Sequence, residues 1–172
     1  TIADTRLIDR AARIGQLDRL RAAFDDGGGS VAAVAGATAG SQTLASERSL
    51  LERLPECLTA FRALPGPGRG RVRAVLSTII VGQIQDLRVF PGEDEGKLAA
   101  METAEDLDRY TYLVAGCVGE FWTEVHVAHR PRLRHWDLPR MRALGVRLGK
   151  GLRLTNVLRD LPRDLRQGRC YL

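Results

Sequence analysis

Aromatic side chains are scarce in this sequence, which has four Phe, three Tyr and two Trp among 172 residues. Sheet cores are usually rich in aromatic and β-branched residues, whereas leucine, alanine and arginine are good helix formers. The composition therefore favours packed helices over sheets. A chain of this length can bury one sizeable core, so a single helical domain is the natural expectation.

Lysine is nearly absent. Lys97 and Lys150 are the only two, so the 26 basic residues are almost all arginine, and the formal net charge is +5. A basic balance of this kind suits an anionic partner, such as nucleic acid, an anionic membrane surface or a phosphorylated substrate. The arginines are scattered and have no interleaved aromatics, which argues against nucleic acid.

Cysteine, histidine and long apolar runs are also sparse. The three cysteines are odd in number and share no short spacing, so neither a disulfide framework nor a zinc site is expected. His126 and His129 are spaced i, i+3, but no acidic or cysteine cluster lies near them to complete a metal site. Reduced thiols in a cytoplasm are the simplest interpretation. No apolar run approaches the roughly 18 residues that a membrane span requires.

The final stretch, residues 145–172, carries the clearest pattern. Five apolar residues fall at i, i+3, i+4, i+7 and i+11, which predicts a helix packed on a core. These are Leu154, Val157, Leu158, Leu161 and Leu165.

A polar column runs beside that stripe, because Asn156, Asp160 and Asp164 fall at i, i+4 and i+8. Neighbouring carboxylates on a half-buried helix repel each other unless a cation lies against them. Oxygen ligands suit Mg²⁺ bridging carboxylates to phosphates, and the interleaved arginines suit phosphate binding. The alternative is a solvated face with Asp–Arg pairs at i, i+3, such as Asp160 with Arg163. The spacing alone leaves both interpretations open.

Three blocks resemble one enzyme family. NVLRDLPRD followed by GRCYL, within residues 156–172, resembles the second aspartate-rich motif of the squalene/phytoene synthases. YTYLVAGCVGEFW at residues 110–122 is similar to the family pattern Y-x-x-x-V-A-G-x-V-G. TIAD at residues 1–4 resembles the end of the first aspartate-rich motif, D-T-I-A-D, with Asp4 as its last aspartate.

The resemblance implies an all-α fold, an isoprenoid-synthase-type helical bundle of about six to eight helices around a central cavity. It implies head-to-head condensation of two prenyl diphosphates by Mg²⁺-assisted ionisation. The VAGCVGEFW block favours the squalene synthases, which make presqualene diphosphate and then squalene with NADPH. Phytoene or dehydrosqualene synthase is the close alternative. A non-catalytic helical module, whose Asp/Arg column forms an interface, is the alternative from another class.

Roles for individual residues follow from the same resemblance. Four residues are expected to hold Mg²⁺, directly or through water: Asp4, Asn156, Asp160 and Asp164. Diphosphate binding is expected from Arg159, Arg169 and Tyr171, and Tyr110 is expected to assist proton transfer near the leaving group. Arg153 stands where the family usually has glutamine. Its fixed charge could strengthen substrate binding or compete with Mg²⁺.

The resemblance also bears on partners and extent. The expected partner is a prenyl diphosphate substrate, in a cytoplasmic protein for which peripheral membrane association would suit an apolar product. Residues 1–172 are expected to be a segment truncated at both ends of a longer domain and inactive alone, since carboxylates from two helices are needed to surround a diphosphate.

Local signals predict the element boundaries. We expect a helix from Leu7 to Asp26, a partly helical connector over residues 30–42, and a helix over residues 44–61 that Pro55 kinks or restarts. A break is predicted at residues 65–68.

The most regular apolar stripe follows over residues 72–87, with Gln83 and Asp86 near its end, and residues 91–96 form an acidic surface turn. Thr103 and Asp106 fit a capping box that opens the helix of Tyr110. A loop over residues 130–140 precedes the last helix, which is predicted to begin near Arg140 or Met141. Pro162 is expected to kink that helix locally.

Overall fold

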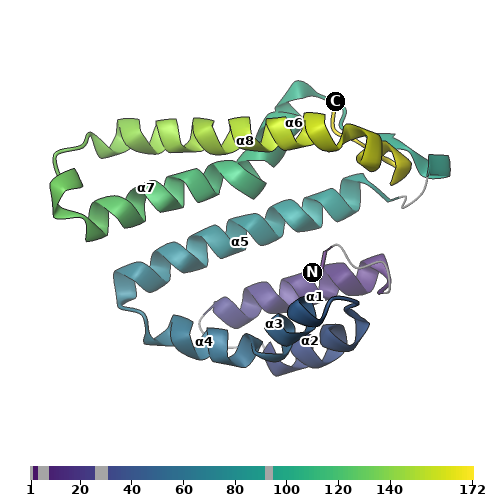
Figure 1. The fold of residues 1–172 in the computed structure, drawn as a ribbon, viewed down its shortest axis with the longest axis horizontal. Helices are drawn as coiled ribbons and strands as arrows, with labels where there is room; N and C mark the ends of the chain where they lie inside the picture. The colour runs from purple at the N-terminus through teal and green to yellow at the C-terminus, as the bar shows by residue number, and fades with distance from the viewer. Residues whose placement is uncertain (1, 4–7, 26–30, 92–94) are drawn as a thin grey trace. The chain divides into compact units, whose positions relative to one another are not determined.

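The structure is a computed structural model that describes residues 2–3, 8–25, 31–91 and 95–172. Those residues are predominantly α-helical, in helices α1 to α8, which confirms the all-α class (Figure 1). Contacts divide the chain into two compact units, Thr1–Ile80 and Val81–Leu172, with the border inside α5 (Gly66–Val89). None of the helices in the described ranges has the length and apolarity to cross a membrane.

The first unit begins with α1 (Arg10–Phe24), which Asp9 caps by accepting hydrogen bonds from the amides of Ala11 and Ala12. Helix α2 (Val31–Thr38), a 3₁₀ turn (Ala39–Ser41), α3 (Ala45–Glu52) and α4 (Leu54–Ala63) follow. A small core joins α1, α2 and α4. It consists of Ala23, Val31, Leu58 and Phe61.

Sequence patterns located these helices with two differences. The segment expected to be a partly helical connector contains α2, which is buried at Val34 and Thr38. Small residues form a packed helix here because they allow close approach to α1 and α4. The break expected at residues 65–68 ends earlier than predicted, because α5 already begins at Gly66. Pro67 lies in the first turn of α5, where the backbone amide has no helical partner and its missing proton costs nothing. Pro55 likewise lies in the first turn of α4 and opens it.

The second unit starts in α5 and continues through a short 3₁₀ turn (Glu95–Lys97) and strand β1 (Ala99–Ala100). Helix α6 (Ala104–Thr111) runs through a π-helical turn, η3 (Tyr112–Gly116), into α7 (Cys117–His129). The predicted cap is confirmed, because the Thr103 hydroxyl oxygen accepts a hydrogen bond from the Asp106 amide.

A 3₁₀ turn (Pro131–Leu133) leads to α8 (Leu138–Arg166), which begins earlier than predicted. Asp137 caps α8 by accepting from the Arg140 amide, and Pro139 occupies its first turn, so this proline opens the helix instead of closing the loop. Pro162 lies inside α8, and the helix continues to Arg166.

Helices α7 and α8 lie side by side (Figure 1), and glycines bring their backbones together. A Cβ atom on Gly145 would lie 2.5 Å from the Gly119 carbonyl oxygen and 2.6 Å from Thr123 Oγ1. A Cβ on Gly149 would overlap the Ala115 carbonyl. The small residues of this segment therefore meet a neighbouring helix.

A turn after α8 returns the chain toward α5. Gly168 has a φ of 73°, in the left-handed region that favours glycine, and closes the helix end. Strand β2 (Arg169–Cys170) then pairs in parallel with β1, through hydrogen bonds of 3.0 Å from the Ala99 amide to the Gly168 carbonyl and from the Met101 amide to the Cys170 carbonyl. This short pairing fixes Arg169 and Tyr171.

Only part of the apolar stripe predicted for α8 is buried. Leu158 is 62% exposed, whereas Asp164 is only 8% exposed and Val157 1%. The inward face carries Val157 against Phe90, Tyr110 and Tyr171. The polar column shares this face, Arg159 and Arg163 pair with its carboxylates, and Leu158 lies on the exposed flank.

Candidate active site

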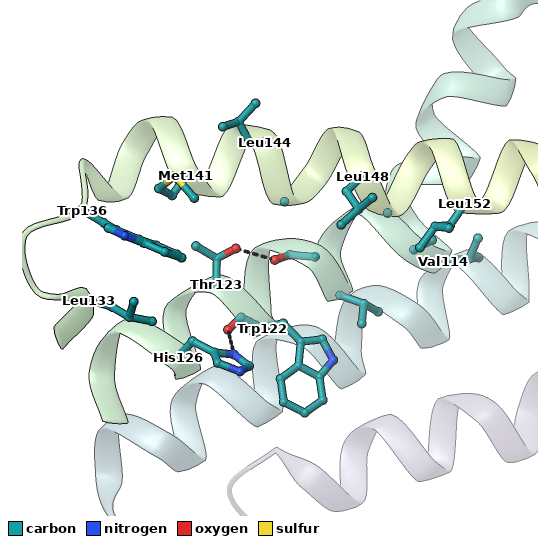
Figure 2. A pocket seen from close by; sticks show the side chains of 15 residues that line it. Val114, Trp122, Thr123, His126, Leu133, Trp136, Met141, Leu144, Leu148 and Leu152 are labelled. Atoms are coloured by element: carbon teal, nitrogen blue, oxygen red, sulfur yellow. Dashed lines mark hydrogen bonds between the residues drawn. The ribbon is translucent and has the colours of Figure 1, made fainter. Parts of the chain in front are cut away.

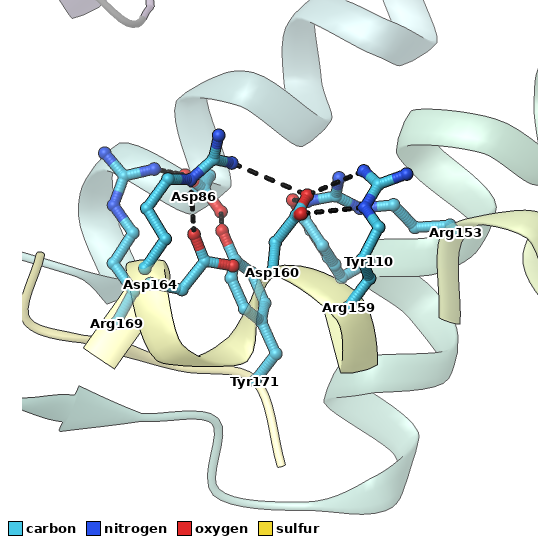
Figure 3. Close-up of polar contacts among 9 residues, drawn as sticks. Asp86, Tyr110, Arg153, Arg159, Asp160, Asp164, Arg169 and Tyr171 are labelled. Carbon is cyan, nitrogen blue, oxygen red and sulfur yellow. Dashed lines mark hydrogen bonds and ion pairs between the residues drawn. The ribbon is translucent and has the colours of Figure 1, made fainter. Parts of the chain in front are cut away.

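Polar side chains from α5, α6, α8 and the C-terminal segment meet in the second unit (Figure 3). Asp86 comes from the end of α5 and Tyr110 from α6. The other members come from α8 and from the segment after it: Arg153, Arg159, Asp160, Asp164, Arg169 and Tyr171. The fold thus gathers residues that are up to 85 positions apart in sequence.

Two buried tyrosines form the centre of this cluster. Tyr110 and Tyr171 are each 3% exposed, and their rings stack with centroids 5.1 Å apart. The Tyr171 hydroxyl donates to Asp86 Oδ1 at 2.6 Å, and Arg169 Nη1 donates to Asp86 Oδ2 at 3.1 Å. Both oxygens of this carboxylate therefore have partners.

Arg153 lies against both rings, with its guanidinium carbon 5.1 Å from the Tyr110 centroid and 5.6 Å from that of Tyr171. Its Nη2 donates to the Tyr110 hydroxyl. Among the described residues, the buried Nε atoms of Arg153 and Arg169 have no hydrogen-bond partner. Buried donors are usually satisfied, so two such guanidinium groups in one cluster suit an anionic ligand.

The environment keeps both phenols protonated. Burial, followed by the negative charge of Asp86, raises the pKa of Tyr110 to about 12, although Arg153 acts in the opposite direction. Burial and the Asp86 charge raise the pKa of Tyr171 as well. Neither phenol is ionised near neutral pH.

The carboxylates of the α8 column have contrasting surroundings. Asp160 accepts hydrogen bonds from Arg159 at 2.8 and 2.9 Å and pairs with Arg163 at 3.5 Å, and the Arg159 bond lowers its pKa. Burial raises the pKa of Asp164, whose nearest cation is Arg163 at 3.8 Å. The predicted i, i+3 pair is thus present, and it joins a half-buried Asp160 to an Arg163 side chain that is 63% exposed. Asn156 lies half-buried on the same face.

The oxygen atoms of the α8 column could bind a cation only together with other ligands. Within the described ranges, no group of three or more His, Cys, Asp or Glu residues could hold a metal ion. The column offers two carboxylates and the Asn156 amide, and Mg²⁺ commonly uses one or two carboxylates with phosphate and water completing its shell. The residues therefore fit Mg²⁺ carried with a phosphorylated ligand, and not an all-protein cage. Asp4, the fourth predicted ligand, lies outside the described residues.

An apolar cavity of about 710 Å³ lies between α7 and α8 (Figure 2). One end is at Val114 and Leu152, next to Arg153, and the other is at Leu133 and Trp136. Its polar side chains have local partners, since Thr123 Oγ1 donates to the Gly119 carbonyl at 2.9 Å and His126 Nδ1 lies 2.8 Å from the Trp122 carbonyl. The cavity therefore presents apolar surface beside an arginine-rich cluster.

Sequence analysis found most of the polar cluster and missed two parts. Tyr110, Arg153, Arg169 and Tyr171 come together as one group, and Arg159 lies beside Asp160 with a side chain that is 65% exposed. Asp86 was noticed in GQIQDL without being assigned to the site. A central cavity was expected from the resemblance, but the lining of this cavity was not identified, although Leu144, Leu148 and Leu152 repeat every four residues along α8 and line it.

The chain is all-helical, and its column of carboxylates and arginines lies beside an apolar cavity. This combination is typical of proteins that bind an anionic ligand with an apolar tail. The whole chain, residues 1–172, matches the squalene/phytoene synthase family. The chain belongs to this family.

Curated relatives match parts of the chain. It is 32% identical over 120 residues to a bifunctional lycopene cyclase/phytoene synthase of Phycomyces blakesleeanus, covering 67% of this chain and 18% of that protein. It is 34% identical over 82 residues to a squalene synthase of Eremothecium gossypii, covering 46% and 18% respectively. A bifunctional lycopene cyclase/phytoene synthase of Arthroderma gypseum is 35% identical over 71 residues, covering 41% and 12%. The matches span less than a fifth of each relative's length.

Proposed function

We propose that this chain contributes the active site of a prenyl transferase that joins two prenyl diphosphates head to head. Family membership supports this reaction class. The observation that carries the proposal is the position of Val114, which lines the apolar cavity and also packs against the buried cluster that contains Tyr110 and Tyr171. One continuous site could therefore hold a diphosphate head and an isoprenoid tail.

The cluster would bind and orient the diphosphate. Arg153 and Arg169 place two guanidinium groups with unpartnered Nε atoms in the cluster, and Arg159, which is largely exposed, could reach an incoming anion. Asp160, Asp164 and Asn156 would hold Mg²⁺ against the same phosphates. When bound, Mg²⁺ supplies positive charge that favours departure of the diphosphate from the allylic carbon.

The cavity would bind the tail along its apolar lining, part of which is open to solvent at Leu148 and Leu152. From Met141 to Leu152, the lining follows α8 for about 16 Å by helical rise, which suits an extended prenyl chain. Trp122 and Trp136 contribute aromatic surface, and such surface stabilises a nearby cation. Tyr110, at the head end, would assist proton transfer.

Farnesyl diphosphate is the substrate that we favour, with presqualene diphosphate and then squalene as products. This outcome follows from the VAGCVGEFW block, whose likeness to squalene synthases implies NADPH as reductant. A phytoene or dehydrosqualene product is the alternative. Peripheral membrane association would suit release of either apolar product.

A binding experiment tests the proposal. We expect Mg²⁺ with farnesyl thiodiphosphate, a slowly ionising analogue, to raise the thermal unfolding midpoint more than either compound alone. Asp160→Asn should reduce this gain. Asp108→Asn is the matched control, because Asp108 pairs with Lys150 at 2.7 Å in an ion pair away from the column and is 67% exposed.

A second candidate is a non-catalytic interaction module, which the ion pairs of Asp160 with Arg159 and Arg163 favour. Such a module would not respond to Mg²⁺ and the analogue. An unchanged midpoint with both compounds present would therefore support the module and contradict the prenyl transferase.

A further inference from the structure

We infer that Arg153 gives the buried cluster of Figure 3 an affinity for a diphosphate group that does not depend on Mg²⁺. The inference rests on the proposed function, because it concerns the same diphosphate site and names the part of the binding that needs no metal. Its basis is the pairing of charges in the cluster, where one guanidinium group has no carboxylate partner.

Every other arginine that joins the cluster forms an ion pair with one of its carboxylates. The pairs, with N–O distances between 2.8 and 3.5 Å, are Arg159 with Asp160, Arg163 with Asp160, and Arg169 with Asp86. Arg163 also lies 3.8 Å from Asp164. Three guanidinium groups therefore face three carboxylates, and their charges balance.

Arg153 is the exception. Among the residues that the structure describes, no carboxylate pairs with it. Its Nη2 donates to the Tyr110 hydroxyl, and its guanidinium group lies over the rings of Tyr110 and Tyr171. Both phenols are neutral near neutral pH, because burial, followed by the charge of Asp86, raises the pKa of each. The charge of Arg153 therefore has no counter-ion among these residues.

Helix α8 places this charge in line with the polar column. Arg153 precedes Asn156 by three residues and Asp160 by seven, so the three side chains share one face of the helix within about 10 Å of helical rise. The Arg153 side chain is half-buried, which weakens the screening of its charge by salt and water. A cation fixed at this place attracts phosphate oxygens and repels Mg²⁺.

Two consequences follow for binding. The cluster keeps a net positive charge when no metal is present, so it should bind inorganic diphosphate in the presence of EDTA through charge-assisted hydrogen bonds. Mg²⁺ should strengthen this binding less than it would if position 153 were neutral. The fixed charge already supplies part of the counter-charge that the metal provides, and it opposes the approach of the metal.

Two variants test the role of this charge. Arg153→Gln removes the charge and keeps a side-chain amide that donates hydrogen bonds, whereas Arg153→Lys keeps the charge and loses the planar guanidinium fork. Arg147→Gln is the matched control, because Arg147 is an exposed arginine of the same helix and its loss changes the net charge equally. Binding of inorganic diphosphate to the whole chain is measured by titration calorimetry, once in EDTA and once in Mg²⁺.

In EDTA, we expect wild type and Arg147→Gln to bind inorganic diphosphate with similar affinity. Arg153→Gln should bind it at least about tenfold more weakly, because a hydrogen bond to a charged group is lost, and Arg153→Lys should stay closer to wild type. The gain in affinity on adding Mg²⁺ should be at least about fivefold larger in Arg153→Gln than in wild type. A purely structural role for Arg153 would instead lower the affinity by the same factor with and without the metal.

Several results would overturn the inference. Wild type that binds inorganic diphosphate only with Mg²⁺ would do so, and this measurement needs no variant. Undiminished binding by Arg153→Gln in EDTA, or an equal loss in Arg147→Gln, would do so as well. If Arg153→Gln does not fold, Arg153→Lys decides, because loss of binding in EDTA by a folded variant that keeps the charge contradicts the inference.

These results differ from a failure of the proposed function. If diphosphate binding requires Mg²⁺, but Mg²⁺ with farnesyl thiodiphosphate still raises the thermal unfolding midpoint, the role of Arg153 is wrong and the proposed function stands. If wild type binds neither inorganic diphosphate nor the analogue with Mg²⁺ present, the proposed function itself fails.

Discussion

Replacement of Gly145 by alanine tests whether backbone contact between α7 and α8 holds the second unit together. The new Cβ would lie 2.5 Å from the Gly119 carbonyl oxygen, 2.6 Å from Thr123 Oγ1 and 3.0 Å from the Gly119 carbonyl carbon. Two of these three atoms are backbone atoms that no rotamer change can move. The helices must therefore separate.

The magnitude follows from two opposing effects. Alanine favours a helix over glycine by about 1 kcal/mol, whereas overpacking in a well-packed interface costs about 1–3 kcal/mol. Two of these contacts are shorter than the 3.0 Å that real Cβ atoms keep from other atoms, so we expect overpacking to outweigh the helix propensity of alanine. Gly145→Ala should therefore destabilise the protein by up to about 2 kcal/mol net. Gly151→Ala in the same helix is the control. A Cβ there meets nothing within 4 Å, so this variant should gain up to about 1 kcal/mol.

Urea unfolding followed by far-UV circular dichroism measures both variants. The two midpoints should move in opposite directions, with Gly145→Ala below wild type and Gly151→Ala above it. Gly145→Ala should also weaken binding of the prenyl analogue, because Gly145 lines the cavity. A Gly145→Ala protein as stable as Gly151→Ala would refute the close helix contact.

Two further predictions concern the cluster. The pKa of Tyr110 in the folded protein is about 12, above the ordinary value of 10.0, so folding favours the protonated phenol. This contribution to the free energy of unfolding is complete below pH 10. It should decrease by roughly 2–3 kcal/mol as pH rises from 10 to 12. Tyrosinate absorbance at 295 nm in native and urea-unfolded protein measures this, and native titration near pH 10 would contradict it. In a full-length enzyme that contains this segment, Asp160→Asn should lower turnover at least ~100-fold while leaving the protein folded, because the leaving group loses its counter-charge. Full activity in that variant would contradict the metal assignment.

Local signals in the sequence were sufficient for the helices that carry the site. The capping pattern at Thr103 places the start of α6, and hence Tyr110, because the N-cap bond depends on neighbouring residues alone. The spacing of Asn156, Asp160 and Asp164 places them on one face of α8 for a similar reason.

Long-range contacts were beyond these signals. The leucine stripe and the polar column lie on adjacent faces of α8, and periodicity cannot tell which one faces inward. The contact of Tyr171 with Asp86 depends on the turn at Gly168 and on the pairing of β1 with β2. A pairing of two residues per strand leaves no alternating pattern to detect, so this part of the site emerged only from the structure.

The inward position of the polar column leads to a final prediction, on Asp164. Burial raises its folded pKa above the ordinary 3.8, so the folded state binds the proton more tightly than the unfolded state. The free energy of unfolding therefore decreases as pH rises from 3.8 through the folded pKa, and at neutral pH the Asp164 charge opposes folding. Asp164→Asn removes that charge at nearly constant volume, so it should raise the urea midpoint at pH 7 and change it little near pH 3.

Asp160 provides the comparison with the opposite sign. The hydrogen bond from Arg159 lowers its pKa below 3.8, so its charge supports folding above that pH, and this support is lost as pH falls through the folded pKa. Asp160→Asn should thus lower the urea midpoint at pH 7, while Asp164→Asn raises it. If both variants shift the midpoint downward at pH 7, Asp164 is not a disfavoured buried charge. The reason for expecting a bound cation to stabilise the column at Asp164 would then be lost.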